Sequence, residues 1–285
     1  MDLAAAGFTS TLIFFSALMF SSLGLGGSAG YLAIFSLLSI PAAAMSTSVL
    51  VINVLVAGMT LHSFIRAGHL PNKHIAPFLV TSVPAAFLGG ALHVKDTTYF
   101  ILLATALLAA AIAVAIAPHQ PVSADAGPEY SQPRSPIIPF LSGIVLGLTA
   151  GVVGIGGGVL LSPILILLRW DTVKRIAATT ALFSLVNSLA GLGGRCFTTA
   201  IDVTTVAHLV VAACAGGLIG SHLGARVFSP QILRRILALL LAGVAVRLMV
   251  TSSEVSMASV HRVIASARSY LHSSAQIKAH FGIWQ

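Results

Sequence analysis

The sequence predicts an all-helical membrane protein of about eight transmembrane helices, and its composition is the first reason. Hydrophobic residues make up 57% of the chain and charged residues only 8%, with a mean hydropathy of +0.99. A soluble domain carries about 25% charged residues, so this chain could not cover a surface that faces water. The apolar residues also form runs long enough to cross a bilayer, which takes about 20 residues of helix.

The predicted spans are apolar runs separated by short polar segments or by Pro and Gly. They lie at residues 8–40, 45–65, 75–92, 99–117, 137–169, 176–194, 203–225 and 232–250. Glycines interrupt the first and the fifth of these runs. No basic segment precedes the first run, so we expect a retained span there rather than a cleaved signal peptide.

An internal repeat divides the chain into two transmembrane halves. Gly24-Leu25-Gly26-Gly27 matches Gly154-Ile155-Gly156-Gly157 at 130 positions later, and Ser46-Thr47 matches Thr179-Thr180 at 133 positions later. We therefore expect a first repeat at 1–117, a Pro-rich linker loop at 118–136, a second repeat at 137–250, and a tail at 251–285 that is a basic amphipathic helix or disordered. Four spans per repeat would make the repeats parallel. Glycine segments that dip into the membrane and return would change that conclusion.

The glycine clusters predict a broken first helix in each repeat. Glycine destabilises a helix by about 1 kcal/mol relative to alanine, so consecutive glycines unwind it. Unwound backbone persists at membrane depth only where it is buried in protein or lines a wet cavity. The half-helix that follows presents free N–H groups and a positive dipole end, which favour an anion. The alternatives are close helix packing through small residues and, much more weakly, a nucleotide-binding loop, which lacks its βαβ context here.

This pattern resembles the TauE/SafE family of sulfite and organosulfonate exporters, also called the sulfonate uptake permease family. The resemblance covers about residues 8 to 250 and is clearest in Gly154-Ile155-Gly156-Gly157-Gly158, Pro163, Ala178-Thr179-Thr180, Gly191 and Ile201-Asp202. The first half departs from it, because Ser28 stands in place of the last glycine. The resemblance implies a secondary transporter of eight spans and, by analogy, a small sulfur-containing anion as its substrate.

Polar residues inside the spans complete the predicted site. The second span carries Ser46, Thr47, Ser48 and Asn53, and the sixth carries Thr179, Thr180, Ser184, Asn187 and Ser188. Hydroxyls and amides can bind the oxygens of an anion, and they can equally hydrogen-bond between helices. The predicted substrate-binding residues are Gly24, Gly26, Gly27, Ser46, Thr47, Asn53, Gly154, Gly156, Gly157, Gly158, Thr179, Thr180, Asn187 and Arg195. His62 is the candidate for proton coupling. For His62 and Arg195 the alternative is an interfacial side chain that reaches toward water.

The net charge of +8 fits the positive-inside bias of a membrane protein and not a nucleic-acid partner, because Lys and Arg are scattered at the ends of apolar runs. If each broken run crosses once, one side carries Lys95, Arg169, Lys174, Arg175, Arg226, Arg234 and Arg235. The other side then carries Arg66, Lys73, Arg134 and Arg195. This count assigns the first group to the cytoplasm.

The predicted function is a multi-pass secondary transporter of the cell membrane that moves sulfite or organosulfonates by alternating access. Its expected partners are membrane lipids, a small anion and protons, with no cofactor and no metal. A passive anion channel would share the composition and the repeat, but would show no saturable, gradient-coupled uptake. A membrane-embedded enzyme would need a polar catalytic pair at matched depth, and the sequence offers no such pair.

Overall fold

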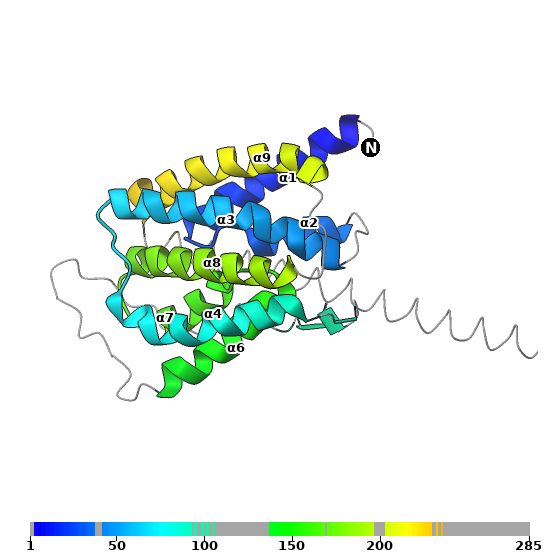
Figure 1. Ribbon diagram of the computed structural model, residues 1–285. Coiled ribbons are helices and arrows are strands. Elements are labelled where there is room, and N and C mark those ends of the chain that lie inside the picture. Colours follow the sequence, from blue (N-terminus) through cyan, green and yellow to red (C-terminus); the bar gives the residue numbers. More distant parts are fainter. Residues whose placement is uncertain are drawn as a thin grey trace, which may run out of the picture.

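The computed structural model describes residues 3–37, 42–92, 137–168, 170–196 and 203–229, with isolated residues at 94–95, 98–99, 101–102, 105, 232 and 235. The described residues are helical (Figure 1): α1 (Leu3–Ser22), α2 (Ser28–Leu37), α3 (Ala42–Arg66), the 3₁₀ turn η1 (Lys73–Ile75), α4 (Ala76–Ala91), α6 (Ile137–Val153), α7 (Gly158–Leu167), α8 (Val173–Arg195), α9 (Val203–His222) and the π-helical turn η2 (Leu223–Val227). The predicted all-helical class is confirmed.

Four helical segments are long and apolar enough to cross a membrane, namely Ser46–Arg66, Lys73–Ala91, Val173–Arg195 and Ala207–Val227. Shorter apolar helices occur at Gly7–Ser22, Ile137–Val153 and Gly158–Leu167. The linker at 118–136 and the tail at 251–285 lie outside the described residues, as do nearly all of the spans predicted at 99–117 and 232–250. The count of eight spans therefore stays a prediction.

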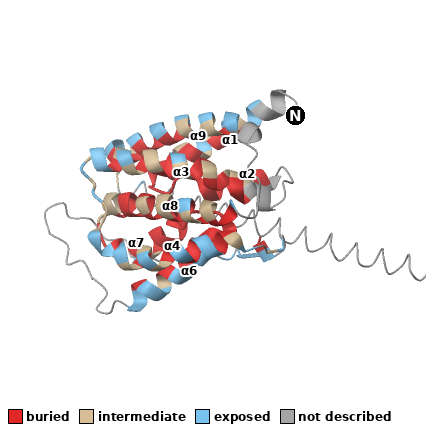
Figure 2. Ribbon diagram, in the orientation of Figure 1, coloured by how far each residue is buried: buried red, intermediate tan, exposed pale blue. Residues whose placement is uncertain are grey.

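Helices α3 and α8 occupy the centre of the bundle and pack against each other in opposite directions (Figure 1). Leu50 of α3 lies at Gly191 of α8, and further along α3 Gly58 lies at Leu185. Helices α1 and α9 cover one side of this pair, and α4 and α6 cover the other. Buried residues gather on the inner faces, whereas exposed ones follow the outer faces (Figure 2). Several buried residues on α3 and α8 are polar, as expected where a membrane protein carries a site rather than a purely structural core.

Two rows of glycines let the outer helices pack closely. A side chain on Gly143, Gly147 or Gly151 of α6 would strike the carbonyls of Phe78, Ser82 and Ala86 of α4. In the same way Gly216 and Gly220 of α9 and Gly224 of η2 face the carbonyls of Phe14, Leu18 and Ser22 of α1. Both pairs are in register at intervals of four residues and run parallel, the small-residue packing that brings membrane helices together. The first helix of each half thus packs against a helix of the other half.

Each glycine break reverses the chain. The first break, Leu23–Gly27, is followed by α2, whose Gly30 lies against Ser16 and Phe20 of α1. A helix that continued forward would place Gly30 about 20 Å from Ser16 and about 15 Å from Phe20, at 1.5 Å per residue. The second break, residues 154–157, separates α6 from α7.

The chain likewise returns after the second break to the end from which it came. The ring of Trp170, just after α7, lies 5.7 Å from that of Phe78 at the start of α4. Phe78 in turn lies against Gly143 near the start of α6. The start of α6 and the end of α7 therefore lie at the same end of the bundle.

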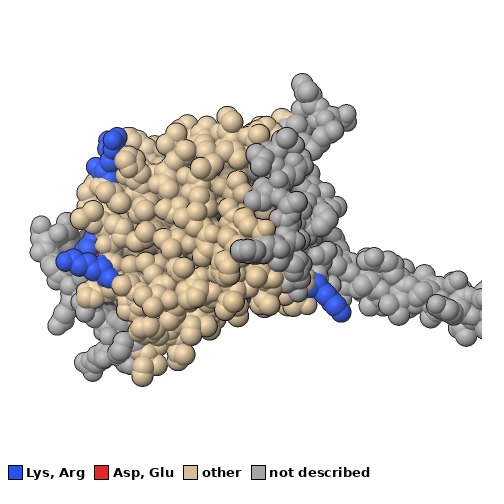
Figure 3. All heavy atoms as spheres, viewed as in Figure 1, with Lys and Arg blue, Asp and Glu red and all other residues tan. Residues whose placement is uncertain are grey.

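The reversals change the predicted grouping of basic residues. Lys174 Nζ donates a hydrogen bond to the carbonyl oxygen of Ala225 at 3.1 Å, and Arg175 Nε donates to that of Leu70 at 3.4 Å. The chain before α8, the end of α9 and the connection after α3 therefore meet at one end. We call it the cation-rich end, since Arg66, Lys73, Lys174, Arg175 and Arg226 all belong to it. Figure 3 shows Lys and Arg only near the two ends of the visible face.

The predicted separation of Arg66 and Lys73 from Lys174, Arg175 and Arg226 was wrong, because it counted each broken run as a single crossing. Lys95 lies at the opposite end, since Tyr99, one turn later, donates from its hydroxyl to the carbonyl of Val153 at the far end of α6. The positive-inside rule now predicts that the cation-rich end faces the cytoplasm.

This orientation can be tested with single cysteines in a background that carries Cys196→Ser and Cys214→Ala. We expect Lys73→Cys to resist a membrane-impermeant maleimide in intact cells and to react after permeabilisation, because its end faces inward. Lys95→Cys is expected to react in intact cells. The opposite labelling pattern would reverse the assignment.

Candidate functional site

The two glycine breaks meet in the middle of the bundle at one side chain, Asn53 of α3. Gly26 has φ +80° and Gly156 has φ +64°, both in the left-handed region that favours glycine. A side chain on Gly26 would overlap Asn53 Oδ1, and one on Gly156 would strike Asn53 Nδ2. The breaks also touch directly, because Ser28 Oγ donates to the carbonyl of Ile155 at 2.7 Å. We call this meeting point the crossed breaks.

Asn53 joins the crossed breaks to α8 through two hydrogen bonds. Its Nδ2 donates to Ser184 Oγ at 3.0 Å and to Ser188 Oγ at 2.8 Å, and all three residues are fully buried. Its Oδ1 accepts no hydrogen bond from the described residues. A buried polar atom without a partner is costly, so it points to a ligand or water that completes the site.

Each break packs against the start of the long central helix of the other half. Gly24 lies so close to Ala177 of α8 that a side chain there would enter the backbone, and Thr180 Oγ1 lies 3.4 Å from the Gly24 carbonyl oxygen, to which it donates. Gly154 similarly faces Ser46 of α3. Because each break packs against the central helix of the other half, its unwound backbone is enclosed by protein and can persist inside the membrane.

The half-helices that leave the breaks point their N-termini at this region. Helix α2 begins at Ser28 and α7 begins at Gly158. The first N–H groups of a helix have no partner within it and carry its partial positive charge. On the first break, the Gly26 carbonyl accepts from the Tyr31 hydroxyl at 3.0 Å. One acceptor of the break is therefore already satisfied, while the positive helix ends remain next to Asn53.

Arg195 neutralises the end of α6 beside the second break. Its Nη2 donates to the carbonyls of Gly151 at 2.9 Å and Val152 at 2.7 Å, and the Tyr99 hydroxyl covers that of Val153 at 2.7 Å. Arg195 is only 5% exposed, so it does not reach toward water. Its charge faces the negative end of a helix dipole, a capping role that places a cation next to the break without bringing it to Asn53.

The other predicted residues are distributed between the centre and the cation-rich end. Thr47 and Asn187 are buried, and Asn187 Nδ2 donates to the Phe183 carbonyl at 2.8 Å while its Oδ1 has no described partner. Thr179 is buried but hydrogen-bonds toward the cation-rich end. His62 lies exposed on α3 and is not brought to the crossed breaks. Gly27, Gly157 and Gly158 line the breaks, facing Tyr31, Phe183 and Thr180 respectively.

Ser184, Ser188 and Ser28 are the site residues that the predicted set lacks. The two serines on α8 lie four positions apart in an apolar helix, a spacing that places them on one helical face. That signal was visible in the sequence, but it does not say which face meets the breaks. Ser28 occupies the position at which the family pattern has glycine, and its hydroxyl is the direct link between the breaks.

Comparisons with known proteins agree with this architecture. The family model described as sulfite exporter TauE/SafE matches residues 10–248. A probable membrane transporter protein, y4hK, from Sinorhizobium fredii (strain NBRC 101917 / NGR234) is 31% identical over 243 residues, which cover 85% of this chain and 96% of that protein. No solved structure gives a significant match. Both glycine breaks lie inside the matched region. The chain is therefore a multi-pass membrane transporter that belongs to the TauE/SafE family.

Proposed function

We propose that this protein is a secondary carrier that moves sulfite or small organosulfonates across the cell membrane by alternating access. The substrate anion binds at the crossed breaks, between the N-termini of α2 and α7 and the polar groups of Asn53, Ser184 and Ser188. The observation that carries the proposal is the meeting of both breaks at one buried amide with an unpartnered atom. The sulfur anion is supported by the name of the family and by the positive helix ends.

The amide of Asn53 can adapt to an anion. Its O and N atoms have nearly the same shape, so a half-turn about the last side-chain bond exchanges their positions. The hydroxyls of Ser184 and Ser188 can donate as well as accept, and they would then donate to Oδ1. Nδ2 would take the present place of Oδ1 beside Gly26 and offer N–H groups to an anion. The site thus binds an oxyanion through neutral donors and helix ends.

The first helices of the two halves run in opposite directions through the bundle, and this supports alternating access. Helix α1 runs toward the cation-rich end, because Ser22 lies at Gly224, next to the Ala225 carbonyl bonded by Lys174. Helix α6 runs away from that end, since Phe140 near its start accepts from Thr81 of α4. Two halves of opposite direction are the arrangement of inverted-repeat transporters, in which one half rocks against the other around a central site.

The proposal is tested by flux of labelled anions in proteoliposomes. Sulfite, thiosulfate and methanesulfonate are supplied in turn, with and without an imposed pH gradient. We expect saturable uptake of sulfite or methanesulfonate, and a response to the pH gradient if protons are the coupling ion. Faster uptake under a pH gradient, whichever its sign, would support coupling of transport to protons. Uptake driven by the anion gradient alone would exclude proton coupling. Absence of saturable flux for all three anions would overturn the substrate assignment.

A further inference from the structure

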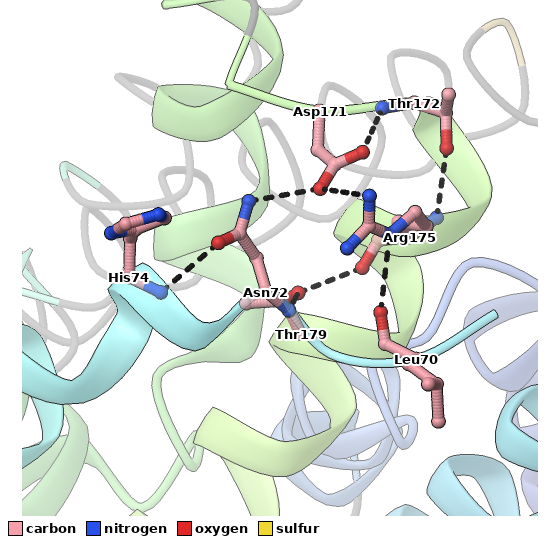
Figure 4. A network of polar contacts seen from close by, with 7 residues as sticks. All are labelled: Leu70, Asn72, His74, Asp171, Thr172, Arg175 and Thr179. Carbon is pink, nitrogen blue, oxygen red and sulfur yellow. Dashed lines mark hydrogen bonds and ion pairs between the residues drawn. The ribbon is translucent and has the colours of Figure 1, made fainter. Parts of the chain in front are cut away.

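A second polar cluster lies at the cation-rich end, around the start of α8 (Figure 4). It joins Leu70 and Asn72, in the connection between α3 and α4, to Asp171, Arg175 and Thr179 at the start of α8. We propose that this cluster, which we call the clamp, is the gate that closes the transport path toward the cation-rich end. The proposal rests on the carrier function proposed above.

The clamp is built from bonds between the two halves of the chain. Asn72 Nδ2 donates to Asp171 Oδ2 at 2.9 Å, and the Asn72 backbone N–H donates to Thr179 Oγ1 at 2.9 Å. Arg175 Nε reaches the Leu70 carbonyl at 3.4 Å. Residues 70–72 precede α4 in the first half, whereas Asp171, Arg175 and Thr179 belong to the second. Separation of the halves at this end must break these three bonds.

Asp171 is the residue of the clamp whose buried carboxylate bonds to both halves of the chain. It is the one carboxylate among the described residues, and its side chain is only 1% exposed. A buried carboxylate needs partners, and Asp171 takes them from both halves. Within the second half it accepts from the Thr172 backbone N–H at 2.7 Å and pairs with Arg175 at 3.4 Å. Loss of Asn72 would leave Oδ2 with only the ion pair to Arg175 at 3.4 Å, and so would remove the partner that the first half supplies.

The clamp lies closer to the surface of the cation-rich end than the crossed breaks do. Arg175 is 42% exposed by its side chain, so it marks the surface at this end. Thr179, one turn deeper on α8, is buried and bonded to Asn72. The next residue, Thr180, donates to Gly24 of the first break, and Ser184 one turn further contacts Asn53. Along α8 the clamp therefore lies nearer to the cation-rich end than the crossed breaks, on the face turned away from Ser184 and Ser188. A separation of the halves that opens this end must still break the clamp bonds.

Accessibility of a buried cysteine tests the gate without requiring transport. The reporter is Ser184→Cys in the background that carries Cys196→Ser and Cys214→Ala. Asn72→Ser is then added, because serine can still cap η1 as Asn72 does through its bond from the His74 N–H, but is too short to reach Asp171. A membrane-impermeant methanethiosulfonate reagent is applied to vesicles of each orientation, with no transported anion present.

We expect Asn72→Ser to raise the reaction rate of the reporter about tenfold from the cation-rich side and to leave the rate from the other side unchanged. Tenfold corresponds to about 1.4 kcal/mol, the scale of one buried hydrogen bond. Leu70→Ala is the matched control, because Leu70 takes part in the clamp only through its carbonyl, which the substitution keeps, and its side chain is exposed. Asp171→Asn removes the charge from the other partner, and should also speed the reaction from the cation-rich side.

An unchanged reporter rate in both Asn72→Ser and Asp171→Asn, with unfolding midpoints close to that of the parent, would overturn the gate. A similar rise from both sides would do the same, because it would indicate general loosening. If none of the three anions were transported, the cysteine-labelling result would still stand, since labelling needs no substrate. The two proposals can therefore fail separately.

Discussion

Gly156→Ala is expected to reduce transport at saturating substrate by about tenfold or more, the loss that about 1.4 kcal/mol of barrier produces. The added methyl group meets Asn53 Nδ2, Ser184 Oγ and Ser188 Oγ together, so it must push apart the groups that form the proposed site. The backbone at this position has φ +64°, which costs a residue with a side chain about 1–2 kcal/mol in addition. Initial uptake rates in proteoliposomes, at matched protein content, measure the loss.

Gly68→Ala is the matched control for this substitution. Gly68 has φ +85°, so alanine suffers the same backbone strain there, but no atom lies within 4 Å of the added methyl group. We expect Gly68→Ala to transport at nearly the parental rate and to lose only a little stability. If Gly156→Ala transported as well as Gly68→Ala, the crossed breaks would be a packing feature and not the site.

Arg195→Met is expected to lower the free energy of unfolding by about 2–6 kcal/mol. Methionine fills much of the same volume but leaves the carbonyls of Gly151 and Val152 without their donor, and each unsatisfied buried group costs about 1–3 kcal/mol. For a chain of this size the change corresponds to a fall of roughly 5–20 °C in unfolding midpoint. Thermal unfolding of the purified protein in detergent measures it.

Arg226→Met provides the comparison for Arg195→Met. Arg226 is an exposed cation for which the described residues show no hydrogen bond from the side chain. The same chemical change there should stay within about 0.5 kcal/mol of the parent. An equally small effect of Arg195→Met would mean that the guanidinium is not needed to cap α6, and would return Arg195 to the candidates for direct anion binding.

Much of the helical framework follows from the sequence, because lipid imposes a simple rule on apolar runs. The run predicted at 176–194 is α8 at Val173–Arg195, and the run at 75–92 is α4 at Ala76–Ala91. The breaks were also predictable from the clusters Gly24–Gly27 and Gly154–Gly158, whereas isolated pairs such as Gly89-Gly90 and Gly216-Gly217 stay helical. Hydropathy carries no information on the direction in which the chain leaves a break. That missing direction produced the wrong grouping of Arg66 and Lys73.

The candidate site was predictable only in part, for a related reason. Asn53 and the glycines stand out as unusual residues at membrane depth, whereas Ser184 and Ser188 gain their meaning from the pairing of α3 with α8. Glycines alone are ambiguous as well. Gly156 has a left-handed backbone at the site, while Gly147 is an ordinary helical residue that lets α6 approach α4. Only the fold separates these two uses of the same residue.

His62 and Arg195 illustrate how repeat matching can mislead. They occupy corresponding positions near the ends of the central helices, yet His62 is exposed and Arg195 is buried against α6. The repeat predicts where a residue lies along its helix but not which neighbour its helical face meets. Coupling through His62 therefore stays a prediction without support from its surroundings.

Counterflow tests the central claim, a carrier that exposes one central anion site to each side in turn, most directly. Proteoliposomes are loaded with a high concentration of the unlabelled anion that the panel identifies, and are then diluted into a trace of the same anion labelled with ³⁵S. A carrier exchanges anions one for one, so labelled anion should accumulate transiently above its equilibrium level and then decline. A monotonic approach to equilibrium without overshoot would contradict the account and indicate a channel.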